Sequence, residues 1–503
     1  MNSDSSRKFR PSLVVLCAIA AAVLAGVYVK KQRAAPRGEP GFLEYVKHPE
    51  LAQAADEQRK QTQAAVAEAQ KWGDDEAEKK IDAFVFAGNE TSSGALPEDK
   101  EILSSLGPRL TAVALKILNE PALRARLTKP TVTEPMAEAP LNRLCELFGD
   151  TTPDELVAPL APFLDDPSEG IRKDVAFTMA KAGTKAIIEP LRKALADQSE
   201  SVRTAALEGL QYPVERGSLD AACKSELFAD VQRVIASQRV DEEAAALLLK
   251  FDQERAAKYF QSAEALKPAN ESLAGILKAL SKTKALIPRP ALLDLIHALQ
   301  AAKADDSKAA KAAKAGDPAG DRLGAALEHL GYWKNPEDEG LLERLTKDPR
   351  KDVAVGAAEG LLAFHGLEDY EEKIATREAK LGFEKLSAPE QYVTAVWDLD
   401  GEVNNGGHTQ YFSNPSGDEW RLASAGLEAM GCKKRAAILH DAMSKFGPNG
   451  PSEEQDARAG QLAKLINKNE KVFDADDDRY FQCDEIVGVY IANYVIKNAQ
   501  SFP

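Results

Sequence analysis

The segment from Gly401 to Asn414 gathers the residue types of this chain that are best suited to chemistry. A carboxylate, several amides, an imidazole and a phenol lie close together there, on Glu402, Asn404, Asn405, Gly406, Gly407, His408, Gln410, Tyr411 and Asn414. Amides and glycine N–H groups suit the binding of a polar partner, whereas an imidazole beside a phenol suits proton transfer. Because a single His without a neighbouring nucleophile is more often structural, we predict no catalytic residue and treat this set as partner-binding candidates.

These candidates follow a predicted helix that ends among them. Its apolar residues are four, three and four positions apart, the spacing of one helical face: Tyr392, Val396, Leu399 and Val403. Asn and Gly tolerate positive φ, so Asn404–Gly407 predicts the end of a helix over 388–403, followed by a short turn near 408–413. Two interpretations stay open, because Asn404–Gly407 either presents a notch of exposed amides or only shapes a turn.

Two further groups of carboxylates have spacings that could bind a cation. Asp398 and Glu402 are four residues apart, which places them on one helical face, but two carboxylates are too few to hold calcium. Asp474–Asp478 with Glu485 matches part of an EF-hand loop, yet Arg479 stands where the sharp turn of that loop needs glycine. We therefore predict no metal site, and a loop with helix-capping carboxylates at Asp474–Asp478.

The segment from Gly401 to Asn414 resembles the signature of a bacterial domain family named after a DNA-mimic protein. The resemblance rests on Glu402–Gly407, on Gln410–Phe412 with Asn414, and on Ala425–Gly431, and it covers about residues 381–503. His408 stands where the family usually has an aromatic or aliphatic residue. The resemblance implies a compact helical domain that binds a protein partner, because the namesake is an acidic dimer that occupies the DNA-binding face of a transcription factor. A homodimer is left open.

Composition supports a helical, acidic protein. The 503 residues have a net charge of −15 and a pI near 5.2, which argues against direct binding of nucleic acid because a basic patch is the expected footprint. An Ala-rich, charge-rich chain with few aromatic residues favours an all-α fold. The five Cys are scattered without CxxC spacing, and no phosphate loop or dinucleotide fingerprint is present, so we predict no cofactor.

The N-terminal segment has the pattern of a membrane anchor. Residues 12–29 form an uncharged apolar run between a basic N-terminus, 1–11, and a basic, Pro-containing linker, 30–43. Eighteen residues nearly span a bilayer core, so we predict a single-pass transmembrane helix in the bacterial cytoplasmic membrane. A cleaved signal peptide is the alternative, although basic residues follow where small residues should precede cleavage. Both flanks are basic, which leaves the side of the soluble part undecided.

The middle of the chain is predicted to be helical throughout. Residues 44–140 have sparse apolar positions and a break near Gly73, which predicts a weakly packed helical stalk. Within 141–370 a pattern that begins at Ile171–Arg172 recurs 31 residues later at Val202–Arg203, and it resembles the short HEAT repeat. A single helix pair cannot bury its apolar face, so such pairs stack into a solenoid. We expect an Asp in each turn to cap the next helix and to pair with Arg172 and Arg203.

Together these features predict a membrane-anchored interaction scaffold without enzymatic activity. It would consist of the anchor, the stalk, a HEAT-like α-solenoid and a C-terminal helical domain at 381–503 that binds a protein, such as a DNA-binding regulator. Two alternatives remain at this point: an enzyme of unknown reaction with a pocket at the Asn-Asn-Gly-Gly-His motif, or a structural envelope protein.

Overall fold

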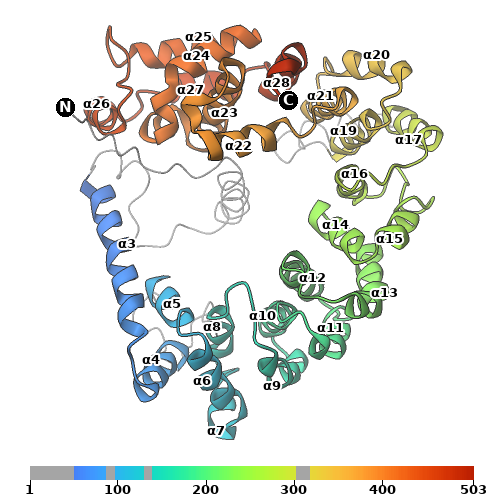
Figure 1. Ribbon diagram of the computed structural model, residues 1–503, viewed down its shortest axis with the longest axis vertical. Coiled ribbons are helices and arrows are strands. Elements are labelled where there is room, and N and C mark those ends of the chain that lie inside the picture. Colours follow the sequence, from blue (N-terminus) through green and yellow to red (C-terminus); the bar gives the residue numbers. More distant parts are fainter. Residues whose placement is uncertain (1–49, 87–96, 130–138, 302–317) are drawn as a thin grey trace. The chain divides into compact units, whose positions relative to one another are not determined.

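A computed structural model describes residues 50–86, 97–129, 139–301 and 318–503, and over these residues the fold is all-α, without strands (Figure 1). This confirms the predicted all-α class for the described part of the chain. None of the helices described is both long and apolar enough to cross a bilayer. The predicted anchor at 12–29, with its flanks 1–11 and 30–43, lies outside the described residues.

The chain divides into two compact units, Ala54–Ala301 and a second unit that includes the described residues from Pro318 to Pro503. The helices of the first unit follow one another along the chain. They are α3 (Glu50–Ala69), α4 (Asp74–Phe86), α5 (Pro97–Ser104), α6 (Pro108–Asn119), α7 (Pro121–Arg124), α8 (Pro140–Glu146), α9 (Val157–Leu160), α10 (Glu169–Ala180), α11 (Ile188–Ala194), α12 (Glu200–Glu215), α13 (Ala221–Ser237), α14 (Glu242–Phe251), α15 (Gln253–Phe260), α16 (Leu273–Lys282) and α17 (Arg289–Ala301).

Helix α4 is packed into the first unit. The break near Gly73 is where the sequence predicts it, between α3 and α4. Ala77, Ile81 and Val85, each four residues apart, are fully buried, and α4 packs on α6 and α8. The prediction of weak packing is therefore wrong for α4, because these three side chains form one apolar stripe despite the charged residues between them.

Successive helices of the first unit repeat one hydrogen-bond pattern. Helix α10 packs on α12, α12 on α14 and α14 on α16. Arg172 Nη1 donates to the backbone oxygen of Asp166 at 2.9 Å, and 31 residues later Arg203 Nη1 donates to that of Asp197 at 2.8 Å. Arg172 Nε also pairs with the Asp197 carboxylate at 2.8 Å, which confirms one predicted pairing. The other is wrong, because Arg203 Nε donates to the Gln238 side chain instead.

The Asp side chains of these turns bind the N-cap residues of the following helices and not the helices themselves. Asp166 Oδ1 accepts the N–H of Ser168 at 2.8 Å, and Asp197 Oδ1 accepts that of Ser199 at 2.8 Å. Ser168 and Ser199 are themselves the N-cap residues of α10 and α12. The Asp side chains therefore fix the turn in an Asx geometry and do not cap the helices directly, which corrects the prediction.

The second unit continues the helical pattern and ends in a helical bundle. Its helices are α19 (Pro318–Gly331), α20 (Pro336–Leu345), α21 (Lys351–His365), α22 (Tyr370–Leu381), α23 (Ala388–Ser413), α24 (Trp420–Met430), α25 (Lys433–Ser444), α26 (Gln455–Lys468), α27 (Asp474–Phe481) and α28 (Val487–Lys497). α23 contacts α24, α26, α27 and α28, which makes it the central helix of the bundle. One apolar core runs from Ala354 on α21 to Phe502, and α21 packs directly on α28.

Helices α19 and α21 lie backbone against backbone. A Cβ atom on Gly331 would lie 1.9 Å from the carbonyl oxygen of Gly360, and one on Gly356 would lie 2.2 Å from that of Gly324. These glycines have ordinary helical backbone, so their role is the close approach of the two helices and not an unusual φ. Because these positions carry glycine, α19 and α21 approach more closely and bury more surface against each other than they could with larger residues there.

The pH dependence of the second unit should reflect His329, which is fully buried on α19. Burial lowers the pKa of His329 from 6.5 to about 4, whereas the unfolded chain binds the proton at its ordinary pKa. The free energy of unfolding should therefore fall as the pH drops from 6.5 toward 4, by about 3 kcal/mol in total. Denaturant unfolding should show about 2 kcal/mol of this loss between about pH 7 and about pH 5. His329→Gln should reduce the loss, whereas the same change at the exposed His440 should leave it as it is.

Candidate partner-binding site

The candidate residues lie on a kink in α23. The sequence predicts that the helix ends at Asn404–Gly407. Instead, it continues to Ser413 after two non-helical residues, Gly406 and Gly407. Gly406 has φ −150° and ψ 23°, and Gly407 has φ 74° and ψ −176°, a conformation that L side chains rarely adopt. The predicted short turn at 408–413 is therefore wrong, because the positive φ falls on one residue only and the chain returns to helical geometry directly afterwards.

Asp477 of α27 clamps the kink from outside the helix. Its Oδ1 accepts the backbone N–H of His408 at 2.8 Å and lies 2.6 Å from His408 Nδ1. A Cβ on Gly407 would lie 2.4 Å from Asp477 Oδ2, so glycine is needed there for space as well as for φ. The acidic run Asp474–Asp478 is consequently the first part of α27 and not the predicted loop.

Glu402 connects the two halves of the kinked helix. Its Oε2 accepts hydrogen bonds from Gln410 Nε2 at 2.5 Å and Asn414 Nδ2 at 2.8 Å, and its Oε1 accepts one from Ser416 Oγ at 3.4 Å. All three donors are neutral, so they satisfy the carboxylate without cancelling its charge. Glu402 is thus part of a local network and not a carboxylate on a solvated helical face.

The nine candidates separate into three groups by exposure. Three are exposed: Asn404, Asn405 and Gly406. Three are half-buried and hydrogen-bonded to one another: Glu402, Gln410 and Asn414. Three are buried: Gly407, His408 and Tyr411. Only the first two groups are accessible to a partner in this conformation, whereas the third shapes the backbone on which they lie.

His408 lies inside a cluster of aromatic rings. Its centroid is 5.6–6.3 Å from those of Phe412, Phe473 and Tyr480, and the side chain has no exposed surface. Its Nε2 has no hydrogen-bond partner among the described residues. Burial also raises the pKa of Tyr411 well above its ordinary value, so this phenol stays protonated and cannot serve as a base. A substrate in solution reaches neither ring.

Arg458 of α26 stabilises the end of α23. No motif or spacing in the sequence indicates this role. Arg458 is fully buried and donates to the backbone oxygens of Phe412 at 2.7 Å and Asn414 at 2.8 Å, where α23 ends and carbonyl groups lose their intrahelical donors. It also donates to Ser452 O at 2.9 Å and pairs with Asp418 at 2.8 Å. Arg458 therefore fixes the position of Asn414, one of the candidate residues.

A second buried arginine joins α25 to the middle of α23. Arg435 Nη1 pairs with Asp400 at 3.2 Å, and the hydroxyl of Tyr480 donates to the same carboxylate at 2.8 Å. Glu485 accepts the backbone N–H groups of Lys434 and Arg435 at 3.1 and 3.0 Å, which caps the N-terminus of α25. The carboxylate at Glu485 is therefore a helix cap and not the last ligand of a calcium loop.

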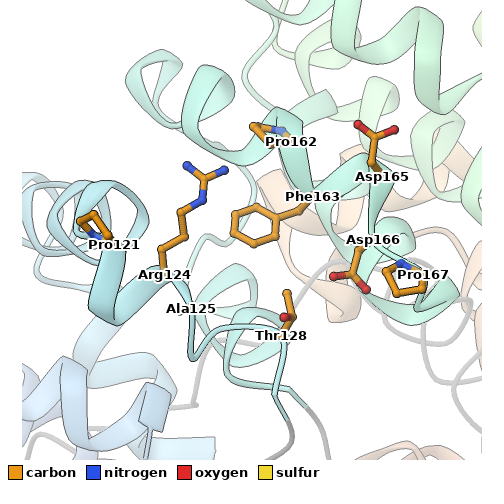
Figure 2. Close-up of a pocket in the computed structure, with 9 residues that line it drawn as sticks. All are labelled: Pro121, Arg124, Ala125, Thr128, Pro162, Phe163, Asp165, Asp166 and Pro167. Atoms are coloured by element: carbon orange, nitrogen blue, oxygen red, sulfur yellow. The ribbon is translucent and has the colours of Figure 1, made fainter.

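A hollow lined by residues of the first unit is the other candidate for a binding site (Figure 2). The guanidinium of Arg124 lies 5.0 Å from the centroid of Phe163, and Lys193 pairs with Asp165 at the edge. The lining is Pro121, Arg124, Ala125, Thr128, Pro162, Phe163, Asp165, Asp166 and Pro167. It contains no His, Cys or Ser, so it does not bring together a nucleophile and an imidazole base.

The geometry from α22 to α28 defines an acidic, all-helical domain built around a kinked central helix. Residues 384–498 match the family model described as DMP19-like protein, so this part of the chain is a DMP19-like domain, as the sequence motif indicates. None of the curated proteins compared with the chain matches it. No solved structure matches it either.

Replacing Gly407 tests the role of the kink. Gly407→Ala should lower the free energy of unfolding by about 2 kcal/mol, because the new Cβ both meets Asp477 and requires a strained positive φ. Denaturant unfolding measures this value. The matched control is Gly401→Ala in the same helix, where no atom lies within 4 Å of the added Cβ. Equal stabilities for the two variants would contradict the role assigned to Asp477.

Proposed function

We propose that this chain is an interaction scaffold without enzymatic activity, whose DMP19-like domain binds a positively charged protein partner. The observation that supports this most directly is the charge of the matched segment. Residues 384–498 contain 19 Asp and Glu against 12 Lys and Arg, a net charge of −7. An acidic surface attracts basic proteins and repels nucleic acid, so a DNA-binding regulator is a fitting partner for a domain of this family.

Stacked helix pairs suit a scaffold as well. The hydrogen-bond pattern of Arg172 recurs at Arg203, and α10, α12, α14 and α16 pack in order along the first unit. We assign this region to a HEAT-like solenoid on that basis. Such arrays offer long surfaces for proteins, which fits a role in holding the partner-binding domain in a larger assembly.

Membrane attachment through residues 12–29 is the remaining part of the proposal. The basis is the uncharged apolar run with basic residues on both sides. Cell fractionation with protease protection tests it and reports the side of the membrane. A DNA-like surface is useful only where DNA-binding proteins are present, so protection from external protease is the expected result. Complete digestion in intact spheroplasts would favour a structural role in the envelope instead.

An affinity experiment can show which of the two compact units binds the partner. Two affinity baits, residues 54–301 and residues 318–503, should differ: the second should retain a basic protein, and retention should fall steeply between about 50 mM and about 200 mM salt. Retention by residues 54–301 alone would move the function to the repeats. Retention that does not depend on salt would exclude the charge-based mechanism.

The alternative of an enzyme at the Asn-Asn-Gly-Gly-His motif receives less support. The imidazole of His408 has no exposed surface, and burial keeps the phenol of Tyr411 protonated. Catalysis there would require an opening of the aromatic cluster before any substrate could reach these groups. A screen in which His408→Phe abolishes a chemical turnover, while the fold is retained, would restore this alternative.

A further inference from the structure

The outer face of α23 exposes one stripe of residues beside the kink. Trp397 lies four residues before Gly401, and Asn404 and Asn405 lie three and four residues after it, so all three share one side of the helix with Gly401. All four are exposed, and Trp397, at 37 %, is one of the few large apolar side chains on the described surface. We refer to these four residues as the Trp397 face.

No described residue packs against the position of a side chain at Gly401. Within the described part of the chain, no atom lies within 4 Å of a Cβ built on it, and its backbone is helical. By contrast, a Cβ on Gly426 of α24 would lie 2.7 Å from Val396 of α23, so that glycine is required by a neighbouring helix. Glycine inside an exposed helix costs about 1 kcal/mol relative to alanine. Gly401 therefore leaves the outer side of α23 without a side chain at this position, although no contact among the described residues requires it.

The charge around the Trp397 face is negative. α23 carries four carboxylates and no Lys or Arg over its whole length. Glu390 and Asp400 pair with Arg377 and Arg435, but the donors to Glu402 are neutral. An aromatic anchor beside the negative charge of Glu402 is complementary to a positively charged surface with an apolar residue. Repulsion disfavours nucleic acid at this face.

We propose that the Trp397 face receives a positively charged α-helix of a protein partner, an inference that rests on the proposed function. The partner helix crosses α23 at Gly401, where the absent Cβ interrupts the row of side chains and lets the two backbones approach. Trp397 packs on the apolar side of the partner helix at one end of the crossing. The amides of Asn404 and Asn405 bind its polar groups at the other end.

Titration of the full-length protein with two synthetic helical peptides tests the proposal. One peptide is amphipathic and built from Leu, Ala and Lys, and the other has Glu in place of Lys. The Lys peptide should bind to the wild-type protein, and Trp397→Ala and Gly401→Leu should each weaken binding about tenfold or more, the loss of one anchor residue. Because Gly401→Leu should also stabilise the helix, its weaker binding cannot result from misfolding. Gly460→Leu is the matched control, since Gly460 on α26 also has no atom near its Cβ.

Four results would overturn the proposal. Equal binding of the Lys peptide by the wild type and both variants would place the contact elsewhere on the domain and leave the proposed function standing. Binding of the Glu peptide as tightly as the Lys peptide would refute the charge complementarity, and binding of neither would refute the helix as occupant. If sedimentation shows that Gly401→Leu converts a dimer into monomers, the face belongs to a second copy. Failure of the proposed function is seen separately, when residues 318–503 retain no protein.

Discussion

Gly331→Ala should lower the free energy of unfolding of the second unit by about 4 kcal/mol, above the roughly 1–3 kcal/mol that overpacking usually costs, because two backbones meet here. The new Cβ would lie 1.9 Å from the Gly360 carbonyl oxygen, which is backbone and cannot rotate away. α19 and α21 would have to separate along their length, with the loss of their mutual packing. Alanine is otherwise the better helix former, so the loss occurs against a gain in helix propensity.

Denaturant unfolding with a control variant measures this effect. Gly340→Ala is the control, because Gly340 lies on α20 in the same unit, is exposed and has no atom within 4 Å of the added Cβ. It should be neutral or stabilising by up to about 1 kcal/mol. If Gly331→Ala and Gly340→Ala have the same stability, the two helices are not in backbone contact in solution.

Arg458→Met should cost about 4 kcal/mol, within the range seen when one partner of a buried ion pair is removed. The change removes the donor of the Phe412 and Ser452 backbone oxygens, one of the two donors of Asn414 O, and the ion pair of Asp418. Arg458→Lys should restore little of this stability, because one ammonium group cannot replace a planar fork that donates in several directions. The far end of α23, including Asn414, should become mobile, which amide hydrogen exchange detects.

Arg421 provides the control for Arg458. It pairs with Glu453 in the same domain, but both side chains are about 60 % exposed, so Arg421→Met should change the free energy of unfolding by less than about 1 kcal/mol. A loss as large as that of Arg458→Met would show that the domain depends on surface charge pairs and not on the buried arginine. Unchanged hydrogen exchange at Asn414 in Arg458→Met would contradict its role at the end of α23.

Local patterns in the sequence predict a substantial part of this structure. Apolar spacing places the helix over 388–403, and the 31-residue repeat predicts the pairing of Arg172 with Asp197. The domain motif around Glu402 predicts the DMP19-like domain. These signals are accurate because each depends on neighbours within one or two helical turns or on one recurring unit.

The contacts that fix the candidate site are not local, and the sequence does not predict them. Arg458 is 46 residues from Phe412 and Asp477 is 69 residues from His408, so no spacing rule relates them. The kink in α23 also depends on a contact between residues far apart in the sequence. Asn404–Gly407 predicts a helix end, but the contact between Asp477 and the His408 N–H allows the helix to resume. In the same way, Asp474–Asp478 reads as a loop until α27 packs on α23.

The core that α21 shares with α28 has a practical consequence for work on this domain. A recombinant fragment that begins at residue 384, the first residue of the family match, lacks Ala354, Ala358 and Leu362, which pack into that core. The apolar side of α28 would then face water, and such fragments should self-associate or precipitate. A fragment that begins at Pro318 retains α21 and keeps that side covered, so truncations for crystallisation or screening belong there.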